Sequence, residues 1–340
     1  MIVDMHCHIL TEEMIRLMQG VSRTYAPILS TTDTPYPSGL TTSSQGFNLT
    51  FPSRNSTTTW PEGGHNVELR LADMARTGVD VQAISPFVGT FLYEIPTEVN
   101  LEFSKIFNEE AVRLKREHPG TFAPLATVPL QDGEAAAAEL ERAVTELGLH
   151  GVATSTSLHD RNLDDPTLEP FYAKLNELRV PWFIHPSFAL IGQRAPKYYL
   201  TNFIGNPLET TIAVAALIFG GVMERYPNIR CWTSHAGGFV PYQFGRLDHG
   251  YQWRPEPKAV VKQPPSTYLN AFLFDIIAHS EPALDYLVQT FGADQVYLGT
   301  DYPFDMGLPD PLGVVEAIGT TDEAGKQRIR EGNARAALRL

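Results

Sequence analysis

The sequence predicts a (β/α)₈ barrel with one small insertion after its first strand, in a single domain over residues 1–340. Eight short apolar runs alternate with helix-like segments along the whole chain. The runs lack strict apolar–polar alternation, which is typical of parallel strands that are buried on both faces. No Gly-x-Gly-x-x-Gly motif follows any run, which removes the main reason to prefer an open dinucleotide-binding sheet. Eight strands alternating with helices therefore favour the closed barrel.

The predicted elements follow one another in a regular order. The strand candidates are Ile2–His6, Asp80–Ser85, Phe122–Val128, Gly151–Ser155, Pro181–His185, Ile229–Ser234, Ala271–Asp275 and Gln295–Thr300. The helix candidates between them are Glu68–Thr77, Asn100–His118, Gly133–Leu147, Pro166–Leu178, Leu208–Arg225, Pro241–His249 and Glu281–Phe291. Some helices follow a good N-terminal signal, such as Asp165 before Pro166. Residues 320–340 are predicted to form the closing helix.

The connection after the first strand does not follow this regular alternation of strands and helices. From about Gly20 to Gly64 the chain is rich in Ser, Thr, Pro and Gly. A structureless loop of that length is unusual inside a compact domain unless it has a function. We therefore expect residues 20–64 to form a small β-type flap over the barrel mouth, with a disordered surface excursion as the alternative.

Charge and composition exclude several classes of partner. The chain has 26 basic and 39 acidic residues, a net charge of −13, which argues against a nucleic-acid or polybasic membrane surface. The longest apolar run, Ile212–Met223, is shorter than the roughly 20 residues of a spanning helix. The N-terminus lacks the pattern of a signal peptide, and Cys7 and Cys231 are too few for a disulfide scaffold. We therefore expect a cytoplasmic protein with no membrane or nucleic-acid partner.

Side chains with metal-binding chemistry follow the predicted strands at their C-terminal ends. His6 and His8 lie two residues apart on the first strand, so both point to the same side. His185 ends the fifth strand, His235 follows the sixth and Asp301 follows the eighth. A barrel carries its active site at this face, and buried imidazoles and carboxylates are costly without partners. We therefore predict that the five residues converge on a divalent ion, with satisfied core histidines as the alternative.

Short motifs also carry a resemblance to a known family. They are His6-Cys-His, His185-Pro, Asn206-Pro-Leu-Glu-Thr-Thr, His235-Ala-Gly-Gly, Phe244-Gly-Arg and Gly299-Thr-Asp-Tyr-Pro. With them the chain resembles the amidohydrolase superfamily, and within it the branch typified by 2-amino-3-carboxymuconate-6-semialdehyde decarboxylase. This resemblance implies that His6, His8, His185 and Asp301 are the metal ligands. It also implies catalytic roles for Asp301 and for His235, which would be the acid/base residue beside the metal.

The resemblance also bears on the number and kind of ions. Binuclear relatives bridge two ions with a carboxylated lysine near the end of the fourth strand, but no lysine lies between Lys115 and Lys174 here. A mononuclear site follows. The resemblance favours one Zn²⁺ per chain, and Mn²⁺ stays open because three imidazoles and one carboxylate suit several divalent ions.

Three further residues are candidates for binding the substrate. The planar fork of arginine suits a carboxylate. By resemblance, Arg246 reaches into the site of a neighbouring subunit, which implies a homodimer. Arg54 is the insertion arginine nearest to a second family arginine, although its spacing to Trp60 differs from the family pattern. Phe304 is predicted to shape the pocket.

Together these features predict a metal-dependent, non-oxidative decarboxylase of a small unsaturated or aromatic carboxylic acid. The reaction would use a mononuclear site and acid/base catalysis by His235. A hydrolase or hydratase on the same scaffold is the alternative, because the ligand set does not separate these reactions. A barrel that only binds a ligand is a third hypothesis, and the presence of all five polar residues disfavours it.

Overall fold

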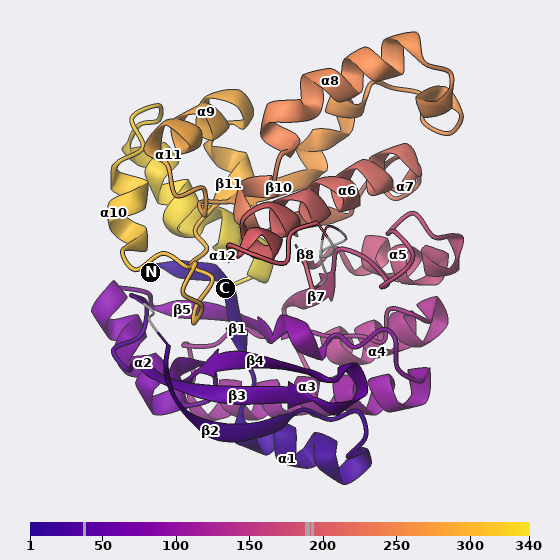
Figure 1. Cartoon of the computed structure of the whole chain (residues 1–340). Helices are drawn as coiled ribbons and strands as arrows, with labels where there is room; N and C mark the ends of the chain where they lie inside the picture. Colours follow the sequence, from indigo (N-terminus) through magenta and orange to yellow (C-terminus); the bar gives the residue numbers. More distant parts are fainter. Residues whose placement is uncertain (37–38, 188–190, 192–193) are drawn as a thin grey trace.

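Eight parallel strands close into a barrel in the computed structural model of the chain (Figure 1), which describes residues 1–36, 39–187, 191 and 194–340. Six strands form one sheet in the order β11-β10-β9-β8-β7-β6, and β1 pairs with β5. Isolated bridges, from Cys7 to Tyr302 and from Gln82 to Phe122, join this pair to the two edges of the larger sheet. The order around the barrel is therefore sequential, which confirms the predicted fold.

The barrel strands are short and almost entirely buried. They are β1 (Val3–Ile9), β5 (Val81–Pro86), β6 (Leu125–Ala126), β7 (Gly151–Ser155), β8 (Pro181–His185), β9 (Arg230–Thr233), β10 (Phe272–Asp275) and β11 (Val296–Tyr297). The bounds of β7 and β8 coincide with the predicted ones. β6 and β11 are shorter than predicted because other groups take the next main-chain N–H. Thr127 N donates to Asn108 Oδ1 at 2.8 Å, and Leu298 N donates to Ile329 O at 2.9 Å.

Helices surround the barrel (Figure 1). They are α1 (Glu12–Val21), α2 (Val67–Thr77), α3 (Thr97–Glu117), α4 (Gly133–Thr145), α5 (Glu169–Leu178), α6 (Asn206–Phe219), α7 (Val222–Arg225), α8 (Val240–Trp253), α9 (Glu281–Phe291), α10 (Pro311–Glu316), α11 (Glu323–Gln327) and α12 (Asn333–Leu338). All seven predicted inter-strand helices are present, and α9 has the predicted bounds.

Two helices were missed, and α1 is the instructive one. Thr11 caps it by accepting a hydrogen bond from Met14 N at 3.2 Å, and Glu12 and Glu13 occupy its first turn. Met14 and Met18 lie on the buried face of this helix. These are ordinary N-terminal helix signals, so the sequence did contain the information. The other missed helix is α10.

Glycine and local winding explain the remaining differences. The predicted helix Leu208–Arg225 divides into α6 and α7, because Gly221 adopts a φ of +73° between them. A 3₁₀ turn, Pro166–Leu168, precedes α5. The predicted closing helix is built from α11, a π-helical turn over Arg328–Gly332, and α12.

The insertion forms an antiparallel sheet that lies beside α1 in Figure 1. Its strands are β2 (Ile28–Pro35), β3 (Gln45–Phe51) and β4 (Ser56–Pro61), in the order β2-β3-β4. Trp60 of β4 is fully buried, and its ring contacts the rings of Phe87 and Phe304. The sheet therefore extends to the loop that follows β11, and its role as a flap over the mouth stays a prediction.

One helix of the described chain is long and apolar enough to cross a membrane by length and composition. It runs over Thr201–Phe219, which is a π-helical turn followed by α6, and 39% of its most apolar window is buried. Leu217 and Ile218 pack into the barrel core. Core helices have this composition too, so the expectation that the chain has no membrane partner stays a prediction.

Candidate metal centre

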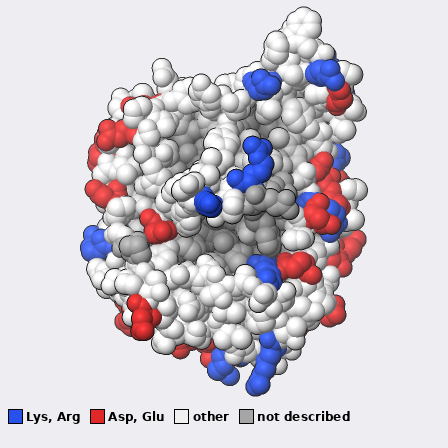
Figure 2. Space-filling view, in the orientation of Figure 1, with Lys and Arg blue, Asp and Glu red and all other residues white. Residues whose placement is uncertain are grey.

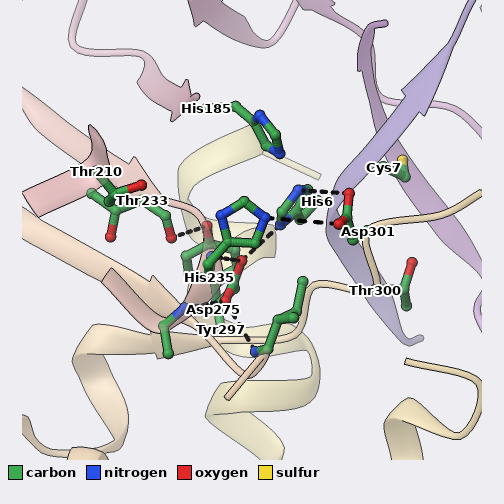
Figure 3. A network of polar contacts seen from close by, with 12 residues as sticks. His6, Cys7, His185, Thr210, Thr233, His235, Asp275, Tyr297, Thr300 and Asp301 are labelled. Carbon is green, nitrogen blue, oxygen red and sulfur yellow. Dashed lines mark hydrogen bonds and ion pairs between the residues drawn. The ribbon is translucent and has the colours of Figure 1, made fainter. Parts of the chain in front are cut away.

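Four of the five predicted residues meet in one buried cluster. His6 and His8 come from β1, His185 ends β8, and Asp301 follows β11. One ligand atom from each lies within 4.8 Å of all the others. Figure 3 shows His6, His185 and Asp301 directed towards one another. The C-terminal ends of barrel strands converge on the axis, which is why residues so distant in sequence come together.

The four inward atoms have the character of metal ligands. Nε2 of each histidine and Oδ1 of Asp301 are buried and, within the described chain, have no hydrogen-bond partner. Nε2 of His6 and Nε2 of His8 each lie 3.2 Å from Asp301 Oδ1. A buried polar atom without a partner costs about 1–3 kcal/mol, so four at one point need a reason. Three imidazole nitrogens and one carboxylate oxygen are a suitable donor set for a divalent cation.

The other ring nitrogen of each of these three histidines, Nδ1, lies within hydrogen-bonding distance of an oxygen atom. His6 Nδ1 lies 2.7 Å from Asp275 Oδ2, His8 Nδ1 lies 3.1 Å from Pro86 O, and His185 Nδ1 lies 2.7 Å from Pro186 O. An Nδ1–H that donates to oxygen leaves the lone pair on Nε2, which then faces the centre of the cluster. This is how proteins fix the tautomer of a metal-binding histidine.

Burial and charge act in opposite directions on these groups. Burial lowers the pKa of His185 well below its usual value, and it also lowers the pKa of His8, so both rings are neutral. Burial would lower the pKa of His6 as well, but the carboxylates of Asp301 and Asp275 raise it to about 10, so a bound cation would have to displace a proton from this ring. Burial would raise the pKa of Asp301, but His6 above all holds it well below its ordinary value. The cluster thus holds an ionised carboxylate that attracts a cation.

Asp275 is the functional residue that sequence analysis missed. It ends β10, and its carboxylate accepts from the main-chain N–H groups of His235 and Ala236 at 2.9 and 2.7 Å as well as contacting His6. One buried side chain therefore orients a predicted ligand and the backbone of the predicted acid/base residue. The sequence signal was its position at a strand end, the same signal that identified Asp301.

His235 lies beside the cluster and is not one of the four converging ligands. Its Nε2 is 3.8 Å from Asp301 Oδ2, and its ring centroid is 4.9 Å from that of His185. Its main chain has a φ of +55°, a left-handed conformation that the two hydrogen bonds to Asp275 stabilise. A cavity of about 550 Å³ opens beside it, with walls that include Phe203, Phe239 and Tyr242.

The structure separates the three predicted substrate residues. The ring of Phe304 lies 5.4 Å from that of His8, at the edge of the cluster. Arg54 forms a two-point ion pair with Glu94, with Nε–Oε1 at 2.5 Å and Nη2–Oε2 at 3.0 Å. Arg246 is exposed on α8 and forms no ion pair with a described residue. Figure 2 shows a hollow in this face of the molecule with Lys and Arg side chains at its rim.

A closed parallel barrel with three histidines and one aspartate converging at its C-terminal mouth defines the class of metal-dependent barrel enzymes. The chain belongs to the amidohydrolase family, because residues 3–340 match the family's sequence model, which is described as Amidohydrolase.

Two relatives and one solved structure illustrate the similarity. The chain is 36% identical over 269 residues to a 2-amino-3-carboxymuconate-6-semialdehyde decarboxylase of Dictyostelium discoideum, covering 78% of this chain and 75% of the relative. It is 28% identical over 288 residues to a 2-keto-4-carboxy-3-hexenedioate hydratase of a Sphingobium species, covering 79% of each. A crystal structure of a Polaromonas dihydroxybenzoic acid decarboxylase with bound manganese and an inhibitor has a TM-score of 0.78 at 22% identity. The match covers 100% of this chain and 97% of that one.

Proposed function

We propose that the protein is a metal-dependent, non-oxidative decarboxylase of a small unsaturated or aromatic carboxylic acid. The observation that carries this proposal is the convergence of four unpaired donor atoms beside His235 at the barrel mouth. Membership of the amidohydrolase family and the 36% identity to a decarboxylase support it. The aromatic walls of the cavity beside His235 suit a flat substrate.

His6, His8, His185 and Asp301 would hold one Zn²⁺ per chain. When bound, a divalent ion supplies Lewis-acid chemistry towards an oxygen of the substrate. A single ion is supported by β7, which contains no lysine that could bridge two. Three imidazoles favour Zn²⁺, and the manganese in the Polaromonas structure makes Mn²⁺ the alternative.

His235 would move the proton that the reaction requires. In decarboxylation the bond between the carboxylate carbon and its neighbour breaks, CO₂ leaves, and the electron pair stays on the neighbouring carbon. That carbon takes a proton from the His235 imidazolium, and solvent returns the proton to the ring. Asp301 Oδ2, 3.8 Å from Nε2, would orient the ring.

Arg246 would bind the substrate carboxylate of a partner subunit in a homodimer. We define the α8 arm as residues 240–260, which project from the barrel at the upper right of Figure 1. Tyr242 and Trp253 on this arm are 81% and 69% exposed, which is costly for aromatic side chains in water. A second copy covering the arm would bury both aromatic side chains and bring Arg246 to the metal centre of the partner subunit.

We also propose a cytoplasmic location, supported by Cys7 and Cys231, which are both free thiols.

A hydratase is the second candidate, because one relative that matches 79% of the chain carries that name. The two reactions differ in their products. Decarboxylation releases CO₂ from the substrate, whereas hydration consumes water and releases no gas.

The decisive assay incubates the metal-loaded protein with a panel of conjugated and hydroxylated aromatic acids that carry a ¹³C-labelled carboxylate. We expect labelled CO₂ from at least one acid, and His235→Asn serves as the matched control that retains the metal ligands. Water addition to a conjugated acid with no labelled CO₂ would contradict the proposal and favour the hydratase.

A further inference from the structure

A buried arginine lies directly behind the metal centre, outside the set of residues that the proposed function uses. Arg70 on α2 is fully buried, and its guanidinium donates to the main-chain carbonyl of His8 and, at 2.8 Å, to Gln82 Oε1. Its carbon Cζ lies 4.6 Å from the centroid of the Tyr302 ring. It forms no ion pair with a carboxylate of the described chain. Burial of a charge costs several kcal/mol unless it is compensated, so this placement needs a reason.

The contacts of Arg70 span the seam where the barrel closes. On one side is β1, which supplies His6 and His8, and on the other is the segment after β11, which supplies Asp301. The two sides are joined by the isolated bridge between Cys7 and Tyr302 and by main-chain hydrogen bonds, such as the one from His8 N to Tyr302 O at 2.7 Å. Arg70 contacts the main chain of His8 on one side and, on the other side, the ring of Tyr302, which follows Asp301.

On the β1 side, one glutamine side chain connects the charge of Arg70 to a buried carboxylate. Gln82 Nε2 donates to Asp4 Oδ2 at 3.3 Å. Asp4 in turn accepts from Thr300 Oγ1 at 2.6 Å, from Thr300 N at 3.0 Å and from His6 N at 3.1 Å. A fully buried carboxylate thus connects the guanidinium, through one glutamine, to the main chain of His6 and to Thr300, which precedes Asp301.

On the other side, the Tyr302 ring connects the guanidinium to a second buried carboxylate. Tyr302, whose ring lies against the guanidinium, donates its hydroxyl to Asp73 Oδ2 at 2.9 Å. Asp73 lies one helical turn after Arg70 on α2 and is fully buried. The network therefore ties α2 to both ligand-bearing segments, and all of its groups are removed from solvent screening.

We propose that Arg70 is a positioning residue for the metal centre, fixing the spacing between the β1 histidines and Asp301 across the barrel seam. The proposal rests on the metal centre described above and extends it to a group that does not touch the ion. A site of four ligands tolerates displacements of only about 0.5 Å, so a brace on the main chain of His8 affects affinity. Groups that support metal ligands typically contribute 10–100-fold to metal affinity.

The test compares metal affinity with stability in three variants. Arg70→Met removes the charge and both hydrogen bonds, and Arg70→Lys keeps the charge but not the two-point contact. Asn108→Leu is the matched control, because Asn108 on α3 is also fully buried and donates at 3.0 Å to Thr127 O and at 2.7 Å to Glu139, away from the centre. The readouts are the dissociation constant for Zn²⁺ by chelator competition, the visible spectrum of the Co²⁺-loaded protein, and the melting temperature of the metal-free protein.

We expect Arg70→Met to raise the dissociation constant 10–100-fold and to change the Co²⁺ spectrum, with Arg70→Lys between it and the wild type. Asn108→Leu should lower the melting temperature with less than a twofold change in affinity. Equal affinity in the wild type and Arg70→Met, or equal losses in Arg70→Met and Asn108→Leu, would overturn the positioning role. If Arg70→Met does not fold, the affinity of Arg70→Lys for Zn²⁺ tests the proposal. A wild-type affinity in Arg70→Lys would then contradict the positioning role. A wild type that binds no divalent ion would instead refute the metal centre itself.

Discussion

The metal centre and the α8 arm differ in how completely one chain supplies what each region needs. At the centre, Nδ1 of each of the three proposed ligand histidines has a partner, and Nε2 of each belongs to the cluster of converging ligand atoms. On the arm, Arg246 forms no ion pair with a described residue, and Tyr242 and Trp253 face solvent. The first region is complete within one chain, whereas we propose that the second becomes complete when another chain covers it. The comparison predicts that variants at the centre act within their own subunit and that variants on the arm act across subunits.

The largest effect is expected from removing a ligand at the centre. His185→Ala deletes one of four donor atoms from a buried site, and the purified variant should lose most of the single ion that we propose for the wild type. Elemental analysis per chain measures this, with His118→Ala as the control, because the His118 ring packs against Phe122 and is not one of the four converging residues. Two ions in the wild type, or full occupancy in His185→Ala, would contradict a mononuclear centre.

The next effect separates His235 from the ligands. His235→Asn should keep the ion and reduce the turnover rate by ~10²–10⁴, the usual contribution of general acid–base catalysis. Its ring lies beside the four converging residues without belonging to them. Measuring metal content and turnover rate on the same sample distinguishes an acid/base residue from a metal ligand. Loss of the ion in proportion to activity would make His235 a ligand.

A smaller effect is expected at Asp275, the residue that supports both His6 and the main chain of His235. Asp275→Asn keeps the shape but loses the charge that attracts the His6 N–H. Metal affinity should fall ~10–100-fold, as for other groups that orient metal ligands. Chelator competition against Asp285→Asn provides the contrast, because Asp285 is a half-buried aspartate on α9 that accepts a hydrogen bond from Gly319 N at 2.8 Å. Identical affinities in the two variants would show that Asp275 does not support the ligand.

The arm is tested by mixing subunits. Arg246→Ala and His235→Asn should each be nearly inactive alone. In an equal mixture about half of the dimers are mixed, and each of these holds one intact site if Arg246 acts across the interface. About one quarter of the wild-type activity should therefore return. No recovery, although mixed dimers are shown to form, would place Arg246 in its own chain or outside the reaction.

The sequence predicted the barrel and most of its centre for a physical reason. Apolar runs and the rule that strand ends meet at one face are local signals, so His6, His185 and Asp301 could be placed before the structure was known. Asp275 obeys the same rule but lacks a companion motif, and so it was overlooked. The helix α1 was overlooked although Thr11 is an ordinary cap.

Contacts between distant residues account for what the sequence did not predict. The pairing of Arg54 with Glu94 joins residues 40 positions apart, and the contact of Arg70 with the His8 carbonyl joins residues 62 apart. No spacing rule connects such pairs, because they depend on how helices and loops pack around the finished barrel. A candidate arginine could therefore be named from the sequence, but its partner could not.

Anomalous diffraction from crystals of the metal-loaded protein tests the central claim most directly. The account predicts one peak per chain, about 2.0–2.2 Å from Nε2 of His6, His8 and His185 and from Oδ1 of Asp301 if the ion is Zn²⁺. His235 should lie outside its first coordination sphere. A second peak in the mouth, a peak bound by His235 in place of one of the four, or no peak in metal-loaded crystals would contradict the account.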